Sequence, residues 1–163
     1  MHTSADKVGT IGEEIRQKKF LSEYHKMTLN IVYTGNWITS INGERLKKHR
    51  LSPPQFNILR ILRGQHPQPA TVNLLIERML DKMSNASRLV DKLKEKGLVA
   101  REISANDRRA CDVVITKKGL DLLSKIDKEQ EEWEESFSGI TKSEAKELNR
   151  LLDKLRGSLQ GIK

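Results

Sequence analysis

Residues 72–96 read VNLLIERM-LDK-MSNASRLVDKLKEK, two helical patterns separated only by Leu80, Asp81 and Lys82. A helix, a turn of about three residues and a second helix are the spacing of a helix-turn-helix. In the second helix, which we expect from Met83 to Lys96, the apolar residues recur on one side, and we expect them to face inward: Met83, Ala86, Val90 and Leu93. The outward side then carries short polar and charged side chains, namely Ser84, Asn85, Ser87, Arg88, Asp91 and Lys92.

This polar side of the second helix suits the major groove of DNA. Short side chains with both donors and acceptors can approach base edges, where asparagine pairs with adenine and arginine with guanine. Candidates for base contacts are Ser84, Asn85, Ser87 and Arg88, and candidates for phosphate contacts are Lys82, Arg88, Lys92 and Lys94. The alternative is an ordinary solvated helix face. The short turn before the helix and the hairpin after it favour DNA.

A β-hairpin is predicted directly after Gly97, which we expect to close the helix. Leu98–Ile103 and Cys111–Ile115 are rich in β-branched residues and enclose a hydrophilic tip. Arginine on an extended loop can enter the narrow minor groove, so Arg108 and Arg109 are candidate contacts, and Asp107 can orient a guanidinium or cap the turn. The alternative is a solvated turn without a partner.

Three stretches together resemble the MarR family of winged-helix regulators. They are SNASRLVDKLKEKGLV at residues 84–99, Asp107-Arg108-Arg109, and ITKKG at residues 115–119. The resemblance is strongest from about Leu51 to Leu123. It implies a mainly α fold with a small β-wing, with residues 83–96 as the recognition helix and Arg109 as the minor-groove arginine. One departure is VNLLI at residues 72–76, which replaces the small residues usual in the first helix.

The resemblance also implies an obligate homodimer. We expect N-terminal dimerisation helices in residues 1–50, a winged helix-turn-helix domain in residues 51–116 and C-terminal dimerisation helices in residues 117–163, all in one MarR-type unit.

Apolar seams in the flanking helices support the dimer independently. A short helix around Ile11–Lys19 precedes a long one from about Ser22 to His49. A capped helix then begins at Ser52-Pro53-Pro54-Gln55 and ends at Gly64.

Two apolar seams are predicted on the helices after Thr116. The first seam runs through Leu123, Ile126, Gln130, Trp133 and Phe137. A second follows the Thr141–Glu144 capping box, through Ala145, Leu148, Leu152, Leu155 and Leu159. The alternative is an intrachain helical hairpin.

The composition favours a polyanion as partner and gives no positive case for an enzyme. The chain has 163 residues, room for one domain, and a formal net charge of +8. No phosphate-cradling glycine loop, nucleophile elbow or metal-ligand pair occurs. With no signal-like or membrane-spanning stretch, we expect a cytoplasmic protein. The single cysteine excludes an internal disulfide, and we expect neither a cofactor nor a metal.

Three residues are candidates for a small-molecule site. Many members of the family bind a small, often aromatic acid between the dimer helices and the winged domain, and Tyr33, Trp37 and Arg60 are placed to line such a crevice. We favour the interpretation that Tyr33 and Trp37 belong to the core of the long helix. Cys111 invites a redox role, but a small hydrophobe on a strand is the commoner one. The four histidines show no metal-binding spacing.

The sequence therefore predicts a DNA-binding transcription regulator, a repressor released by a ligand, acting on a roughly palindromic operator. The alternative is a winged-helix module that binds another protein. From Lys82 to Arg109, eight cations stand against four anions, which favours DNA.

Overall fold

The computed structural model describes residues 9–103 and 111–159, and the side chains of Glu102, Ile103 and Cys111 are not described. The chain divides into two units, residues 1–116 and 117–163.

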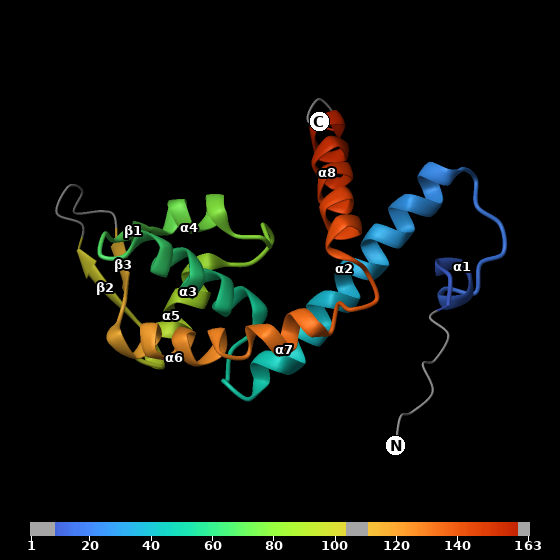
Figure 1. Cartoon of the computed structure of the whole chain (residues 1–163). Coiled ribbons are helices and arrows are strands. Elements are labelled where there is room, and N and C mark those ends of the chain that lie inside the picture. Colours follow the sequence, from blue (N-terminus) through green and yellow to red (C-terminus); the bar gives the residue numbers. More distant parts are fainter. Residues whose placement is uncertain (1–8, 104–110, 160–163) are drawn as a thin grey trace, which may run out of the picture. The chain divides into compact units, whose positions relative to one another are not determined.

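The first unit contains a helical domain built on three helices and a small sheet (Figure 1). The helices are α3 (Pro53–Gln65), α4 (Val72–Arg78) and α5 (Ala86–Glu95). Each presents apolar residues at helical spacing to a common core, and the core side chains are fully buried: Ile58, Leu59, Leu62, Leu75, Val90, Leu93 and Val113. Mutual burial of these faces is the main stabilising term that fixes how α5 is oriented.

The sheet has three antiparallel strands in the order β1-β3-β2. The strands are β1 (Ala70–Thr71), β2 (Val99–Ile103) and β3 (Cys111–Ile115). Val99 pairs with Ile115 and Ile103 with Cys111, so β2 and β3 form the predicted hairpin. β1 was not expected from the sequence, because a two-residue strand carries no periodic pattern. A mainly helical chain with a small antiparallel sheet confirms the predicted fold class.

Local hydrogen bonds fix one end of each of two helices in the domain at residues that the sequence predicts, Ser52 and Gly97. The Ser52 hydroxyl accepts from the Gln55 N–H, and the Ser52 N–H donates to Gln55 Oε1 at 3.1 Å. Gly97, with φ of 70°, follows α5 in a left-handed conformation. The Leu98 N–H donates to the Leu93 carbonyl, and the Gly97 N–H donates to the Lys94 carbonyl. These two hydrogen bonds form the Schellman motif that ends a helix. Gly64, in contrast, lies inside α3 and does not end it.

The N-terminal part of this unit is a short helix and a long one. α1 covers only Ile11–Glu14, because the chain turns at Arg16, whose φ is 53°, so the expected helix to Lys19 is wrong in length. α2 runs without interruption from Glu23 to Lys47, capped by Ser22. Leu46 is buried in α2, but a row of large apolar side chains is exposed on it: Val32, Tyr33, Trp37, Ile38 and Ile41.

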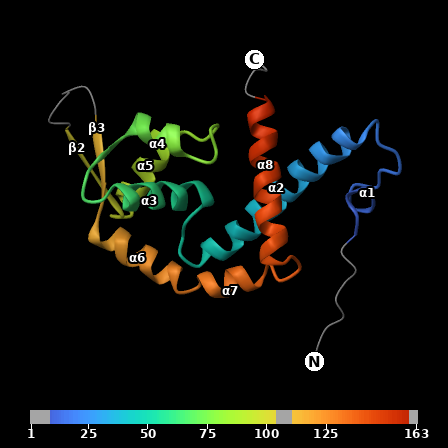
Figure 2. The same cartoon turned by 45° about the horizontal axis from the view of Figure 1, so that its top comes forward.

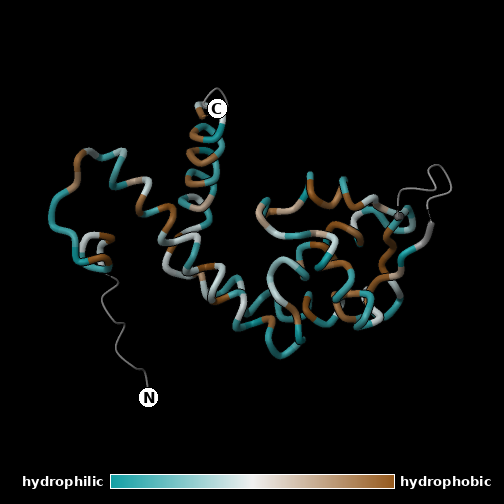
Figure 3. Tube along the Cα trace, turned by 180° about the vertical axis from the view of Figure 1, so that it is seen from behind, coloured by the Kyte–Doolittle hydropathy of each residue, from teal (hydrophilic) through white to brown (hydrophobic). Residues whose placement is uncertain are grey.

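The second unit contains α6 (Lys117–Asp127), α7 (Gln130–Glu135) and α8 (Lys142–Leu159). The seam predicted as one helix is divided between α6 and α7, while the Trp133 and Phe137 rings still meet edge to face at 5.0 Å. The Thr141 N–H donates to Glu144 Oε2 at 2.8 Å, as the capping box predicted. Apolar and polar residues alternate around α8 (Figure 3), and none of its residues is buried.

Candidate nucleic-acid interface

The orientation of α5 determines which side chains reach the surface. Ala86, Val90 and Leu93 are buried, as predicted for three of the four inward positions. Because these residues share one side, Ser87, Arg88 and Lys92 are exposed on the other, together with Lys94. The exposed part of α5 therefore carries hydroxyl, guanidinium and ammonium groups, together with the carboxylates of Asp91 and Glu95.

The segment before α5 differs from the predicted one. α4 ends at Arg78 and α5 begins at Ala86, so the connection is longer than the expected three residues and takes in Met83, Ser84 and Asn85. Met83, expected inside, has a side chain that is 93% exposed. The helical period extends into the turn in the sequence, but Asn85 stops it by capping the helix.

Asp81 organises this connection through both carboxylate oxygens. Oδ1 accepts from the Met83 N–H at 2.9 Å and Oδ2 from the Ser84 hydroxyl at 2.6 Å. The Ser84 and Met83 hydrogen bonds stabilise the charged form and hold the pKa of the Asp81 carboxyl below its ordinary value. An aspartate two residues before a backbone donor is an Asx-turn pattern, a sequence signal from which this role could have been found.

Asn85 and Lys82, both predicted to contact DNA, also have structural partners. The Asn85 Oδ1 accepts from the Arg88 N–H at 3.0 Å and caps α5, leaving the amide NH₂ group for other contacts. The Lys82 ammonium donates to the carbonyls of Ile76 and Glu77, the last turn of α4. A cation there satisfies carbonyls that lack helical partners. Lys82 thus supports the connection as well as adding positive charge.

Two further contacts fix α5 to the rest of the domain. Arg101 on β2 forms a 2.8 Å ion pair with Asp91. The Lys96 ammonium donates to the Arg50 carbonyl at 2.6 Å and to Gln55 Oε1 at 3.1 Å. Partial burial, with a smaller effect from Lys92, lowers the pKa of Lys96. Asp91 and Lys96 thus position the helix, while Arg88 and Lys92 are placed to meet a partner.

Residues 50–110 match the sequence model of the MarR family. This stretch of the chain therefore resembles a MarR-family domain. The chain is 29% identical over 134 residues to the transcriptional repressor IacR of Pseudomonas putida, a match that covers 77% of this chain and 79% of that protein.

Two solved structures show the same fold. The organohalide-sensing regulator RdhR, bound to 2,4-dichlorophenol, superposes with a TM-score of 0.75 at 22% identity, covering 85% of this chain and 82% of that one. Staphylococcus aureus MepR in complex with DNA superposes with a TM-score of 0.71 at 20% identity, covering 87% and 100%.

The predicted wing residues, Asp107, Arg108 and Arg109, lie outside the described residues. The strands that lead to the tip are described, and their register ends with the Ile103–Cys111 pair.

The three candidate crevice residues are all exposed. Tyr33 and Trp37 are 38% and 59% exposed, one turn apart on α2, so the favoured interpretation of both as core residues is wrong for the single chain. The described residues of this unit leave both side chains on the α2 face exposed, and helical periodicity alone placed them inside because it shows only that a helix has an apolar side. The Tyr33 hydroxyl donates to Glu14 Oε2 at 2.8 Å. Arg60 lies on α3, its guanidinium 6.0 Å from the Phe56 ring.

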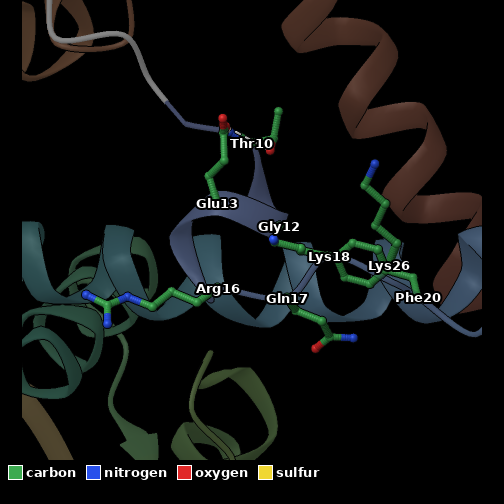
Figure 4. A pocket seen from close by; sticks show the side chains of 8 residues that line it. All are labelled: Thr10, Gly12, Glu13, Arg16, Gln17, Lys18, Phe20 and Lys26. Atoms are coloured by element: carbon green, nitrogen blue, oxygen red, sulfur yellow. Dashed lines mark hydrogen bonds between the residues drawn. The ribbon is translucent and has the colours of Figure 1, made fainter.

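A pocket of about 600 Å³ forms elsewhere in the chain, around α1 and the start of α2 (Figure 4). Its lining contains neither Tyr33, Trp37 nor Arg60; it consists of Thr10, Gly12, Glu13, Arg16, Gln17, Lys18, Phe20 and Lys26. Lys26 lies 5.6 Å from the Phe20 ring centre, whereas Arg16 extends away from this pair. The cations of the pocket do not converge on one point.

Among the described residues, no group of three or more His, Cys, Asp or Glu side chains is placed to hold a metal ion. Within the same ranges, no helix is both long and apolar enough to span a membrane.

Proposed function

We propose that this chain is a homodimeric transcription regulator of the MarR family, which binds a roughly palindromic stretch of double-stranded DNA. Each dimer places two α5 helices in successive major grooves, about 34 Å apart. The observation that carries the proposal is the presentation of Ser87, Arg88 and Lys92 on the exposed side of α5, fixed by the burial of the opposite side. A DNA partner also implies the cytoplasm as the place of action.

The division of roles among these residues follows from their chemistry. Arg88, Ser87 and the free amide donors of Asn85 are proposed to meet base edges, since they lie at the start of α5. Lys92 and Lys94, both exposed further along α5, are proposed to neutralise phosphates. Ser84 and Lys82 are held in the preceding connection and contribute there through position and charge. In the wing, Arg108 and Arg109 are proposed to enter the minor groove beside Asp107.

Dimerisation is proposed to cover the exposed apolar residues of α2 and α8. Leu148, Leu151 and Leu159 are exposed on α8, and the row on α2 includes Val32 and Trp37. Contiguous apolar residues left in water mark an interface with another surface. The roles of residues 1–50 and 117–163 as dimerisation segments rest on this observation.

A small aromatic molecule is proposed to regulate the protein by causing its release from DNA. An effector that favours a dimer with a different α5 spacing lowers DNA affinity by its difference in affinity for the two forms. RdhR, which shares the fold, binds 2,4-dichlorophenol. Tyr33, Trp37 and Arg60 are the proposed contacts, with the two exposed rings offering stacking surfaces. Repression follows the relative IacR, a transcriptional repressor.

The proposal is tested by selecting bound duplexes from a random pool at near-physiological salt. We expect a palindrome whose half-sites are about one helical turn apart. Binding to every duplex with equal affinity would contradict it.

The phosphate contacts are tested on the selected duplex by replacing Lys92. Lys92→Ala should reduce the slope of log affinity against log salt by about one or less per subunit, since one fewer counterion is released. Lys125→Ala, which removes the same charge from α6, is the matched control and should leave the slope unchanged. Equal effects of the two substitutions would mean that net charge, and not α5, determines binding.

A further inference from the structure

Two large apolar side chains project from the connection between α4 and α5. Leu80 is 87% exposed and Met83 is 93% exposed. Figure 2 shows this connection as an extended loop at the end of α4 that leads back into α5. It carries the chain to the N-terminal end of the helix proposed to read DNA.

The polar side chains of this loop form hydrogen bonds within the loop or with the two helices that it joins. Asp81 binds the Met83 N–H and the Ser84 hydroxyl, and Lys82 binds two carbonyls of α4. Asn85 caps α5 through its oxygen. The side chain of Met83 is thus directed outward on a backbone held on both sides, two residues before the helix cap.

Met83 lies in the connection just before α5, next to the end of the helix proposed to read base edges. In helix-turn-helix proteins the N-terminal residues of the recognition helix contact the bases. Among the groups in the major groove that distinguish base pairs, the 5-methyl group of thymine is the apolar one. Methionine, unbranched and adaptable, can follow a methyl group whose exact position varies.

We propose that Met83 recognises the 5-methyl group of a thymine in each operator half-site. The inference rests on the proposed DNA-binding function and adds to it an apolar contact beside the polar ones of α5. Leu80 lies three residues further from α5 than Met83, so it is assigned no base.

The test uses the duplex selected as described above, with each thymine of one half-site replaced in turn by deoxyuridine, which lacks only the methyl group. For the unsubstituted protein, replacement of the thymine at one position should weaken binding about fourfold, which corresponds to the free energy of burying one methyl group. Met83→Ala should bind the thymine duplex about fourfold or more weakly, and deoxyuridine at that position should then have no further effect.

Three variants complete the experiment. Met83→Leu should keep most of the thymine preference, because it keeps an apolar side chain, and Met83→Gln should lose it at nearly constant length. Leu80→Ala is the matched control, and its deoxyuridine penalty should equal that of the unsubstituted protein. All variants should keep the thermal midpoint, since both side chains are exposed.

The proposal is overturned if Met83→Ala and the unsubstituted protein show the same penalty at every thymine, or if no thymine shows a penalty. The proposal is also overturned if Met83→Ala leaves DNA affinity unchanged. That result would favour a protein as the partner of the Met83 side chain. Absence of any selected duplex is a different result, because it overturns the DNA-binding function itself.

Discussion

Asn85 illustrates how one residue can serve both the fold and the partner. Its Oδ1 caps α5 by accepting from the Arg88 N–H, while its NH₂ group takes no part in the cap. The sequence supplied the residue type for both roles, since asparagine is favoured at helix caps and also pairs with adenine. Periodicity alone placed Asn85 inside the helix, because the helical spacing of apolar residues extends back to Met83.

The two roles of Asn85 separate under substitution. Asn85→Ala removes the cap and should lower the free energy of unfolding by about 1 kcal/mol, whereas Asn85→Ser keeps a capping oxygen and should change it by only a few tenths. Both substitutions remove the amide donors, so both should alter sequence preference. Guanidinium unfolding at fixed protein concentration and competition between duplexes measure the two effects. A stable, fully selective Asn85→Ala protein would contradict both assignments.

Helices and strands were predictable where packing and capping agree. The Ser52–Gln55 box, the Thr141–Glu144 box and Gly97 mark ends that the sequence predicts correctly, because each uses local hydrogen bonds. The connection from Met79 to Asn85 was not predictable in length, since the Asp81 contacts and the Asn57–Leu80 hydrogen bond replace helical ones. β1 depends on pairing with β3, a contact distant in sequence.

Two glycines test the assignment of helix ends. Gly97 needs its left-handed backbone, so Gly97→Ala should destabilise the protein by about 1 kcal/mol. Gly64 lies inside α3, and a Cβ there meets no neighbouring atom within 4 Å. Gly64→Ala should therefore stabilise the protein by about 0.4–1 kcal/mol. Chemical denaturation compares the pair, and effects of the same sign would contradict these helix ends.

At the scale of the whole molecule, the single chain leaves apolar residues in water. Their helical spacing was visible in the sequence, but periodicity shows that a helix has an apolar side and not what covers it. That is why Tyr33 and Trp37 were assigned to a core, although the described residues of their own unit leave both side chains exposed. The apolar rows of α2 and α8 are the molecular basis for the proposed dimer.

The dimer is tested by placing a charge in the α8 seam. Leu148→Asp should weaken dimerisation by roughly a hundredfold or more, because a carboxylate would lose water at the interface. Lys146→Asp, at an exposed position on the polar side of the same helix, is the control and should leave the dimer intact. Sedimentation equilibrium over micromolar concentrations measures both. A monomeric unsubstituted chain would instead support an intrachain arrangement of the helices.

The central claim is that one twofold dimer presents two α5 helices at a fixed spacing. The direct measurement is the affinity of the full chain for its selected duplex before and after insertion of about five base pairs between the half-sites, which turns one half-site to the opposite side of the DNA. The account predicts a loss of at least about a hundredfold, with substantial recovery when about ten base pairs are inserted. Equal affinity for all three duplexes would contradict it.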